Sequence, residues 1–172
     1  KRRGDRASAD RVTNYDKSST PELAPTPGPG AGGVEAQLTT TMPAPYGEHS
    51  IIESMANAIR ESKKYVFIEN QYFRNPALND VLFVRMNAVP TLKLVVVTMP
   101  VSEWTDPGCV WTHRSHARFR DAFRGRYLML QLRSFETTTP SESGEVKAAF
   151  ASINTHSKLL VVDDRFLSVG SA

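Results

Sequence analysis

The sequence predicts an α/β domain, a mixed β-sheet flanked by helices, over residues 48–172. Helix-like segments alternate with short apolar runs through this region, as in chains that fold into helices and strands around one sheet. The run "LKLVVVTM" is apolar nearly throughout, which is typical of a strand covered by helices on both faces. With 172 residues and 40% hydrophobic content, the chain can bury a substantial core.

The first ordered element is predicted within "SIIESMANAIRESKK". Ser50 and Glu53 have the spacing of a capping box, in which each side chain accepts a hydrogen bond from the other's backbone. Apolar residues then recur at helical spacing and form one stripe, at Ile51, Ile52, Met55 and Ile59. These signals predict a helix of about four turns that ends at Lys63 and Lys64.

Three further elements and a strand-rich end follow. The expected order is a strand at "YVFIEN", a helix near residues 77–88, the strand "LKLVVVTM" and a helix from Val110 to Arg124. Pro90, Pro100 and Gly125 stand where the last three should end. After them we expect one strand over "YLMLQLRSF", a polar insertion "ETTTPSESGE" and three strand-like stretches.

The last two strands are predicted to form a hairpin. Asp163 and Asp164 tolerate turn conformations and separate "LLVV" from "RFLSVG". A two-residue turn at these aspartates would place Lys158 opposite Val169 and His156 opposite Ser171. Since residues two apart on a strand share a face, His156, Lys158 and Ser171 would gather in one polar patch.

Such a patch suits phosphoryl chemistry. A neutral imidazole can attack phosphorus, while an ammonium and a hydroxyl neutralise charge on the phosphoryl oxygens. This chemistry requires no metal and no cofactor. A histidine and a lysine two apart on a strand are, taken alone, more often ordinary surface polarity.

The N-terminal residues 1–47 differ from the rest. A basic start is followed by "SSTPELAPTPGPGAGG", which has no apolar period and is typical of a tether or surface loop. The net charge of +3 leans weakly toward anionic partners, and the lone cysteine, Cys109, excludes an internal disulfide framework. No apolar run has the length of a membrane span, the sequence assigns no compartment, and the chain is expected to be a fragment.

The spacing of five residues carries a family resemblance. His156, Lys158, Asp163, Gly170 and Ser171 match the H-x-K-x4-D-x6-G-S signature of the phospholipase D superfamily, called HKD. Five fixed residues at set offsets should match by chance on the order of once in ten thousand chains of this length. The family's signature continues with one residue and an asparagine, and this chain ends before the asparagine.

A second stretch narrows the resemblance. "YVFIENQYF" resembles the "IENQ(Y/F)F" segment of the phospholipase D enzymes that act on phosphatidylcholine-type lipids, and it makes Glu69, Asn70 and Gln71 candidate substrate-binding residues. The resemblance covers residues 34–172 and implies the C-terminal half of a two-lobed, pseudo-symmetric enzyme. The second HKD half would lie on a preceding segment or on another copy.

The resemblance also implies a reaction. A phospholipid at a membrane surface would be hydrolysed to phosphatidic acid and an alcohol through a phosphohistidine, with transfer to other alcohols as an extension. His156 would act as general acid or, with roles reversed, as nucleophile; Lys158, Gly170 and Ser171 would bind phosphate, and Asp163 would support the site. With only one signature histidine, the isolated chain is expected to be inactive.

Two alternatives remain open. The first is a nucleic-acid phosphodiesterase of the same fold, for which a helix with four arginines would contact the backbone, although "IENQYF" argues against it. The second is a half that binds phosphate or membranes without turnover.

The arginines of the predicted third helix are Arg114, Arg118, Arg120 and Arg124. We interpret them as a solvated face, with a lipid surface second and nucleic acid third.

Overall fold

The structure, a computed structural model, describes residues 33–100, 107–138, 144 and 146–170. The chain divides into two units, Lys1–Leu38 and Thr39–Ala172. Of the first unit, residues 33–38 are described, and they form no helix or strand. The predicted boundary at residue 47 stays a prediction, and every helix and strand described below belongs to the second unit.

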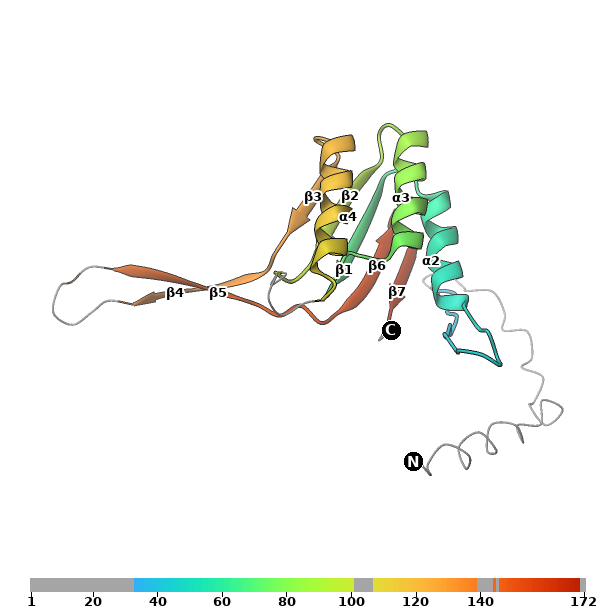
Figure 1. The fold of residues 1–172 in the computed structure, drawn as a ribbon, viewed down its shortest axis with the longest axis horizontal. Coiled ribbons are helices and arrows are strands. Elements are labelled where there is room, and N and C mark those ends of the chain that lie inside the picture. Colours follow the sequence, from blue (N-terminus) through green and yellow to red (C-terminus); the bar gives the residue numbers. More distant parts are fainter. Residues whose placement is uncertain (1–32, 101–106, 139–143, 145, 171–172) are drawn as a thin grey trace, which may run out of the picture. The chain divides into compact units, whose positions relative to one another are not determined.

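A five-stranded mixed sheet organises the second unit (Figure 1). Its strand order is β3-β2-β1-β6-β7; β1, β2 and β3 run parallel, whereas β6 is antiparallel to both β1 and β7. The strands are β1 (Tyr65–Asn70), β2 (Lys93–Val97), β3 (Tyr127–Leu130), β6 (Lys158–Val162) and β7 (Phe166–Val169). The predicted α/β class is therefore confirmed.

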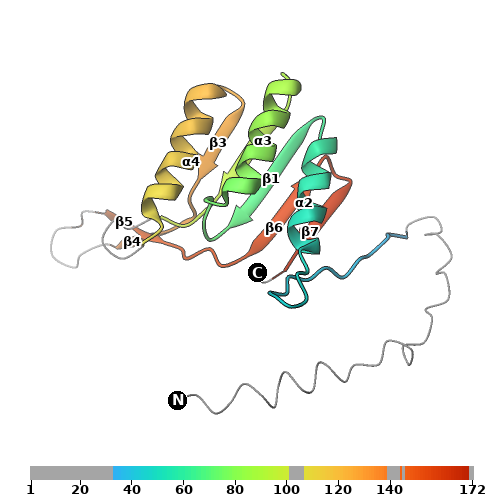
Figure 2. The same ribbon diagram turned by 45° about the vertical axis from the view of Figure 1, so that its right-hand side comes forward.

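The described helices lie on one face of this sheet, as Figures 1 and 2 show. They are α2 (Ser50–Glu61), α3 (Pro76–Ala88) and α4 (Cys109–Ala122). Each helix contributes to one buried cluster with the strands: Ile59, Leu82, Met86, Phe119 and Phe123 from the helical side, and Val66, Leu94, Val96, Leu160 and Val162 from the sheet. The expectation that helices cover both faces of β2 is wrong for the described residues.

The other face of the sheet is also apolar. Strand pairing aligns one residue from each strand in a row, and the row across the middle is Leu167, Val161, Phe67, Val95 and Leu128. Its two outer members, Leu167 and Leu128, are exposed, and the other three are half-buried. In β2, Leu94 and Val96 therefore pack in the core on one side of the sheet, and Val95 lies in the apolar row on the other side.

The start of α2 differs from the predicted capping box. His49 occupies the N-cap position without a side-chain cap, and Ser50 is the first helical residue. The Ser50 hydroxyl instead donates to Thr40 O at 3.1 Å and accepts from Thr40 N at 3.0 Å. Glu48 Oε1 accepts from Ser50 N at 3.0 Å. Ser50 therefore joins Thr40 to the first turn of α2. At its other end α2 stops at Glu61, before the predicted Lys63 and Lys64.

The predicted strand "YLMLQLRSF" is two strands. Residues Tyr127–Leu130 form β3 of the main sheet, and after two residues β4 (Arg133–Thr138) pairs with β5 (Lys147–Ser152) in a separate two-stranded ribbon. Part of the predicted polar insertion belongs to β4 and part to residues outside the described ranges. A continuous run of strand-forming residues cannot show where a chain leaves one sheet for another.

The β6–β7 hairpin has a three-residue turn, Asp163 to Arg165, in place of the predicted two-residue turn. Asp163 and Asp164 have φ angles of 53° and 58°, the left-handed region that aspartate tolerates better than most residues. The pairing is Leu159 with Val169 and Leu160 with Ser168, one residue away from the predicted register. A slip of one residue exchanges the faces of all side chains on one strand relative to the other.

The Asp163 carboxylate fixes this turn to the loop between α2 and β1. It accepts backbone N–H bonds from Lys63 at 2.5 Å, Lys64 at 2.8 Å and Tyr65 at 2.8 Å. Burial raises the pKa of Asp163, but the three N–H donors outweigh it and leave the pKa below its usual 3.8. The Tyr65 hydroxyl bonds the neighbouring Asp164 carboxylate, so both aspartates hold the same junction.

We predict that Asp163→Ala lowers the free energy of unfolding by about 2 kcal/mol at pH 7, because three charge-assisted bonds are lost. Asp164→Ala is the matched control, since it loses the same left-handed preference and one hydroxyl bond. The carboxylate's lowered pKa stabilises the fold above the unfolded pKa, and this contribution disappears as the pH falls through the native pKa. Urea unfolding from pH 7 to pH 2 should therefore show the free energies of unfolding of the wild type and Asp163→Ala becoming equal in acid. A difference that stays constant with pH would contradict the stabilising role of the Asp163 carboxylate.

Candidate functional site

The candidate site lies at one end of the strands of the sheet, where β1 ends and β6 begins. We call this end of the sheet the site edge. Asn70, the last residue of β1, pairs with Lys158, the first residue of β6. Pairing places Asn70 and Lys158 on the face that also carries Ile68 and Leu160, the helix-covered face. The end of β7 reaches the same place, since Gly170 N donates to Lys158 O at 3.1 Å.

The structure brings the side chains of His156 and Lys158 together. Lys158 Nζ lies 3.3 Å from His156 Nδ1 and donates to the His156 backbone carbonyl at 2.9 Å. His156 is exposed and Lys158 is half-buried, so the pair faces solvent at the rim of the sheet. An imidazole and an ammonium at this separation can both reach one phosphoryl oxygen.

Glu69 lies on the opposite face of β1 from Asn70. Its carboxylate accepts a hydrogen bond from the Ser157 hydroxyl, which belongs to the residue between His156 and Lys158. The predicted substrate-binding residues Glu69 and Asn70 are therefore on different sides of the sheet, and Glu69 holds the histidine–lysine segment from behind.

Gln71 continues β1 into the loop, and its contacts are mainly structural. Its backbone carbonyl accepts from Thr98 Oγ1 at 2.8 Å, which joins the ends of β1 and β2. Asn70 Oδ1 accepts from Tyr72 N at 3.4 Å. Both residues thus order the loop that leaves β1 at the site edge.

Arg74 adds a guanidinium to this edge. It lies 3.8 Å from the ring centroid of Tyr72. It also crosses Gly108, the residue before α4, so closely that a Cβ there would stand 1.9 Å from Arg74 Nη1. A side chain at position 108 would therefore displace the Arg74 guanidinium from this place.

Asp163 lies at the far end of β6 from the histidine–lysine pair. Five residues of strand separate the two ends, about 16 Å at 3.3 Å per residue. Because its carboxylate is bound to three backbone N–H groups, its role in the described structure is to hold the turn.

The glycine and serine of the signature have different outcomes. Gly170 N donates to Lys158 O at 3.1 Å, so this amide is used in strand pairing. Ser171 lies outside the described residues. The register that would have placed it opposite His156 is the one the structure corrects, so that argument for Ser171 no longer holds.

Sequence reasoning missed Ser157, Thr98 and Arg74. Ser157 is enclosed by the signature, but its partner Glu69 is identified only by the pairing of β1 with β6. The partner of Thr98 likewise depends on two strand ends meeting. No local sequence pattern marks such contacts.

The histidines of α4 form no metal centre within the described residues, where no cluster of three or more His, Cys, Asp or Glu could hold an ion. His116 Nδ1 bonds the Tyr127 hydroxyl, and the His116 ring packs 5.5 Å from that of Phe73. Burial lowers the pKa of His116 to about 4. His116 is thus a neutral packing residue of the helix–sheet interface.

Comparison with known proteins gives a structural likeness and no family. The chain matches no protein-family model and no curated protein. Among solved structures it is similar to NucT from Helicobacter pylori, with 15% sequence identity, a TM-score of 0.47, and coverage of 75% of this chain and 70% of that chain. A likeness of this size carries no argument about activity. The structure defines a mixed α/β domain with a histidine–lysine pair at an exposed sheet edge.

We predict that Ser157→Ala loosens the histidine–lysine segment. Loss of one charge-assisted bond should cost about 1.5 kcal/mol and raise amide exchange at residues 156–158. Glu69→Gln should retain most of the protection, because its amide oxygen can still accept from Ser157, whereas Glu69→Ala should behave like Ser157→Ala. Hydrogen–deuterium exchange measures this, with Ser168→Ala on β7 as control. Equal exchange in all four variants would exclude the Glu69–Ser157 bond as a support.

Proposed function

We propose that this chain supplies one half-site of a phosphodiesterase of the phospholipase D type. The observation that carries the proposal is the 3.3 Å approach of Lys158 Nζ to His156 Nδ1 at an exposed sheet edge. The five-residue spacing of the signature supports it independently. The fold alone does not, since one α/β architecture hosts many activities.

The chemistry divides between two histidines, one from each half. The nucleophilic imidazole attacks phosphorus, and the bond from phosphorus to the leaving alcohol oxygen breaks. The second histidine, as imidazolium, gives its proton to that oxygen. Water then attacks the phosphohistidine, the former acid accepts its proton, and the nucleophile is released. We assign His156 to the acid role, with the reverse assignment open.

Lys158 contributes electrostatic stabilisation to this scheme. Its ammonium lies 3.3 Å from His156 Nδ1, near enough to stabilise negative charge on phosphoryl oxygens bound beside the imidazole. Glu69, through Ser157, would set the position of both groups. The second histidine would come from a second HKD half, on the same polypeptide or on another copy.

A phospholipid is the proposed substrate class. It is supported by the resemblance of "YVFIENQYF" to the segment of enzymes that act on phosphatidylcholine-type lipids. The products would be phosphatidic acid and a free alcohol. The competing substrate is nucleic acid, favoured by the exposed arginines on and just after α4: Arg114, Arg118, Arg120 and Arg124. Of these, Arg118 pairs with Asp80 and Arg120 with Asp121.

The anion site can be tested without turnover. We predict that inorganic phosphate shifts the NMR signals of the His156 imidazole, and that Lys158→Ala weakens this binding about tenfold through loss of a charge-assisted contact. Lys93→Ala is the matched control, because Lys93 also begins a strand. It lies at the other end of the strands, beside the start of β1, away from the site. Phosphate affinity that is the same in both variants would remove Lys158 from the site.

The substrate class is tested with a protein that carries both halves. We predict release of the alcohol from phosphatidylcholine vesicles, and a loss of about 10³-fold in rate for His156→Ala. Lys93→Ala should keep the wild-type rate. Parallel incubation with single-stranded DNA is the comparison. Cleavage of DNA alone would reject the lipid substrate, and an unchanged rate in His156→Ala would remove this histidine from the reaction.

A further inference from the structure

The β4–β5 ribbon presents two aromatic side chains to solvent. Phe135 and Phe150 are 57% and 66% exposed. Their rings lie opposite each other, with centroids 5.1 Å apart and planes inclined at 50°. Two-stranded ribbons are marginal in water unless something packs on them. Among the described residues, no other ring is recorded in contact with this pair.

The ribbon has one aromatic face. The register places Phe135 opposite Phe150, and alternation puts the pairs Arg133 with Ser152 and Thr137 with Ala148 on the same side. The other side carries Ser134, Ala151, Glu136 and Ala149. The described charged side chains of the ribbon are thus one arginine, on the aromatic face, and one glutamate on the other.

The ribbon leaves the main sheet at the edge that carries the candidate site. β4 follows the end of β3, and β5 leads through a few residues to His156. The root is closed by a hydrogen bond from Ile153 N to Leu132 O at 3.1 Å, and both of these side chains are exposed. Figures 1 and 2 show the ribbon departing where β3 ends. An apolar surface therefore extends from the ribbon to the neighbourhood of the histidine.

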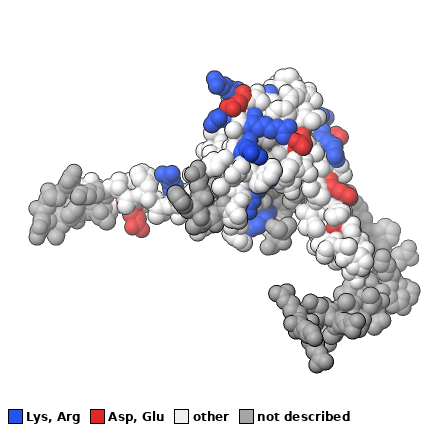
Figure 3. Space-filling model, in the orientation of Figure 1, with Lys and Arg blue, Asp and Glu red and all other residues white. Residues whose placement is uncertain are grey.

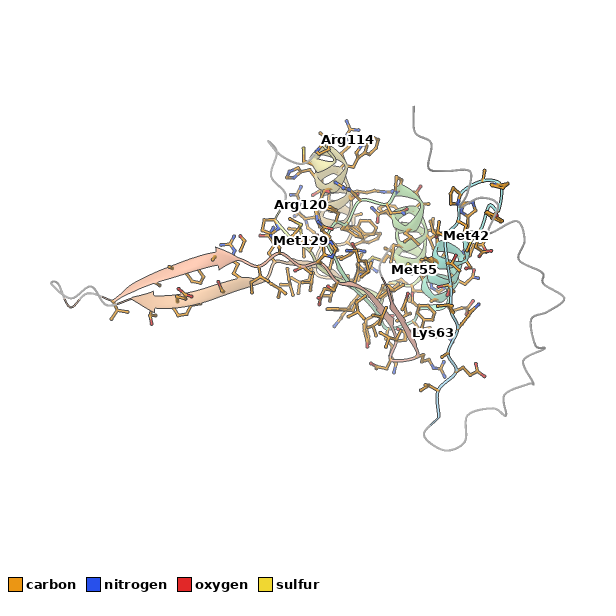
Figure 4. The ribbon with its side chains drawn as sticks, turned by 90° about the horizontal axis from the view of Figure 1, so that it is seen from below. Met42, Met55, Lys63, Arg114, Arg120 and Met129 are labelled. Atoms are coloured by element: carbon orange, nitrogen blue, oxygen red, sulfur yellow. The ribbon has the colours of Figure 1, made fainter. Side chains whose placement is uncertain are left out.

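The first turn of α4 forms a second exposed apolar feature. Val110 and Trp111 are 50% and 55% exposed, and the Arg114 guanidinium lies 5.5 Å from the Trp111 ring. α4 begins after the loop that follows β2, beside the same edge (Figures 1 and 2). Arg114 stands on the outer side of the helical layer in Figure 4, and Figure 3 shows lysines and arginines on the helical face with acidic residues among them.

We propose that the aromatic ribbon and the first turn of α4 dock this chain onto an anionic phospholipid bilayer. Tryptophan favours the interface between head groups and acyl chains, exposed phenylalanines insert into that boundary as apolar anchors, and nearby arginines are attracted to anionic lipid. The ribbon's outer strand edges carry unpaired backbone groups, so the ribbon lies at the interface and does not cross the hydrocarbon. This inference rests on the proposed function, because it places the site beside a lipid substrate.

Charge favours a bilayer over nucleic acid as the occupant. Single-stranded nucleic acid binds grooves in which several cations follow the phosphates between stacking aromatics. The two strands of the ribbon carry two basic residues, Arg133 and Lys147, against one acidic residue, Glu136, which is too few to follow several phosphates. Its main exposed groups are instead phenylalanine, leucine and isoleucine, which a lipid surface accommodates.

The test is sedimentation of the full 172-residue chain with vesicles of phosphatidylcholine alone or mixed with phosphatidic acid. The double variant Phe135→Ser/Phe150→Ser should bind the mixed vesicles at least tenfold more weakly, whereas Phe135→Leu/Phe150→Leu should retain binding. Val84→Ser is the matched control, because Val84 is 68% exposed on α3 and outside the ribbon. Circular dichroism verifies that each variant is folded.

Other results would overturn the proposal. Wild-type binding by the double serine variant would exclude the ribbon. Binding of a single-stranded oligonucleotide but not of vesicles would assign the surface to nucleic acid. If the wild type is a dimer that does not bind vesicles, and the double serine variant is a monomer, the surface would be assigned to a second copy. His156→Ala should bind vesicles normally. If the wild type binds phosphate but not vesicles, the docking surface alone is rejected. If it binds vesicles but not phosphate, the catalytic site alone is rejected.

Discussion

The antiparallel pairing of β6 with β1 is the constraint on which the candidate site depends. It places Lys158 opposite Asn70 and carries His156 to the rim of the sheet. The pairing is fixed at both ends. Asp163 binds three backbone amides at one end, and Ser157 binds Glu69 at the other. Because the Ser157 anchor joins residues 88 apart in the sequence and the Asp163 anchor joins residues 98 to 100 apart, the site depends on long-range strand pairing.

This arrangement explains why the five residues of the signature have different physical roles. His156 and Lys158 meet at the solvent-facing rim, Gly170 pairs with Lys158 through the backbone, and Asp163 lies a strand's length away. A carboxylate at that distance cannot orient the imidazole directly. It acts by fixing the turn and hence the register, and a slip of one residue would turn Lys158 to the other face.

The sequence predicted the elements better than their connections. The strand at residues 65–70, the helix near residues 77–88 and the central valine-rich strand were each recognisable from local periodicity. The two-residue turn at Asp163 was wrong, because aspartates tolerate left-handed positions in turns of either length and so do not indicate how long the turn is. The Ser50 capping box was also wrong, since Ser50 bonds Thr40 across a loop. The approach of His156 to Lys158 could be predicted from their two-residue spacing, although His156 precedes β6 and is not part of a strand. The Glu69–Ser157 bond needed the register between distant strands.

The two faces of the sheet determine what the chain can do next. One face is closed by three helices, and the other presents an apolar row that includes exposed Leu167 and Leu128. The site lies at the boundary between these faces, with Lys158 toward the helices and Glu69 toward the open side. A group that covered the open face would therefore bury the Glu69–Ser157 bond and strengthen it, since hydrogen bonds gain strength as the local dielectric falls. Covering that face would stiffen the histidine–lysine segment without touching either residue, so the packing of the sheet and the order of the site are coupled through Glu69.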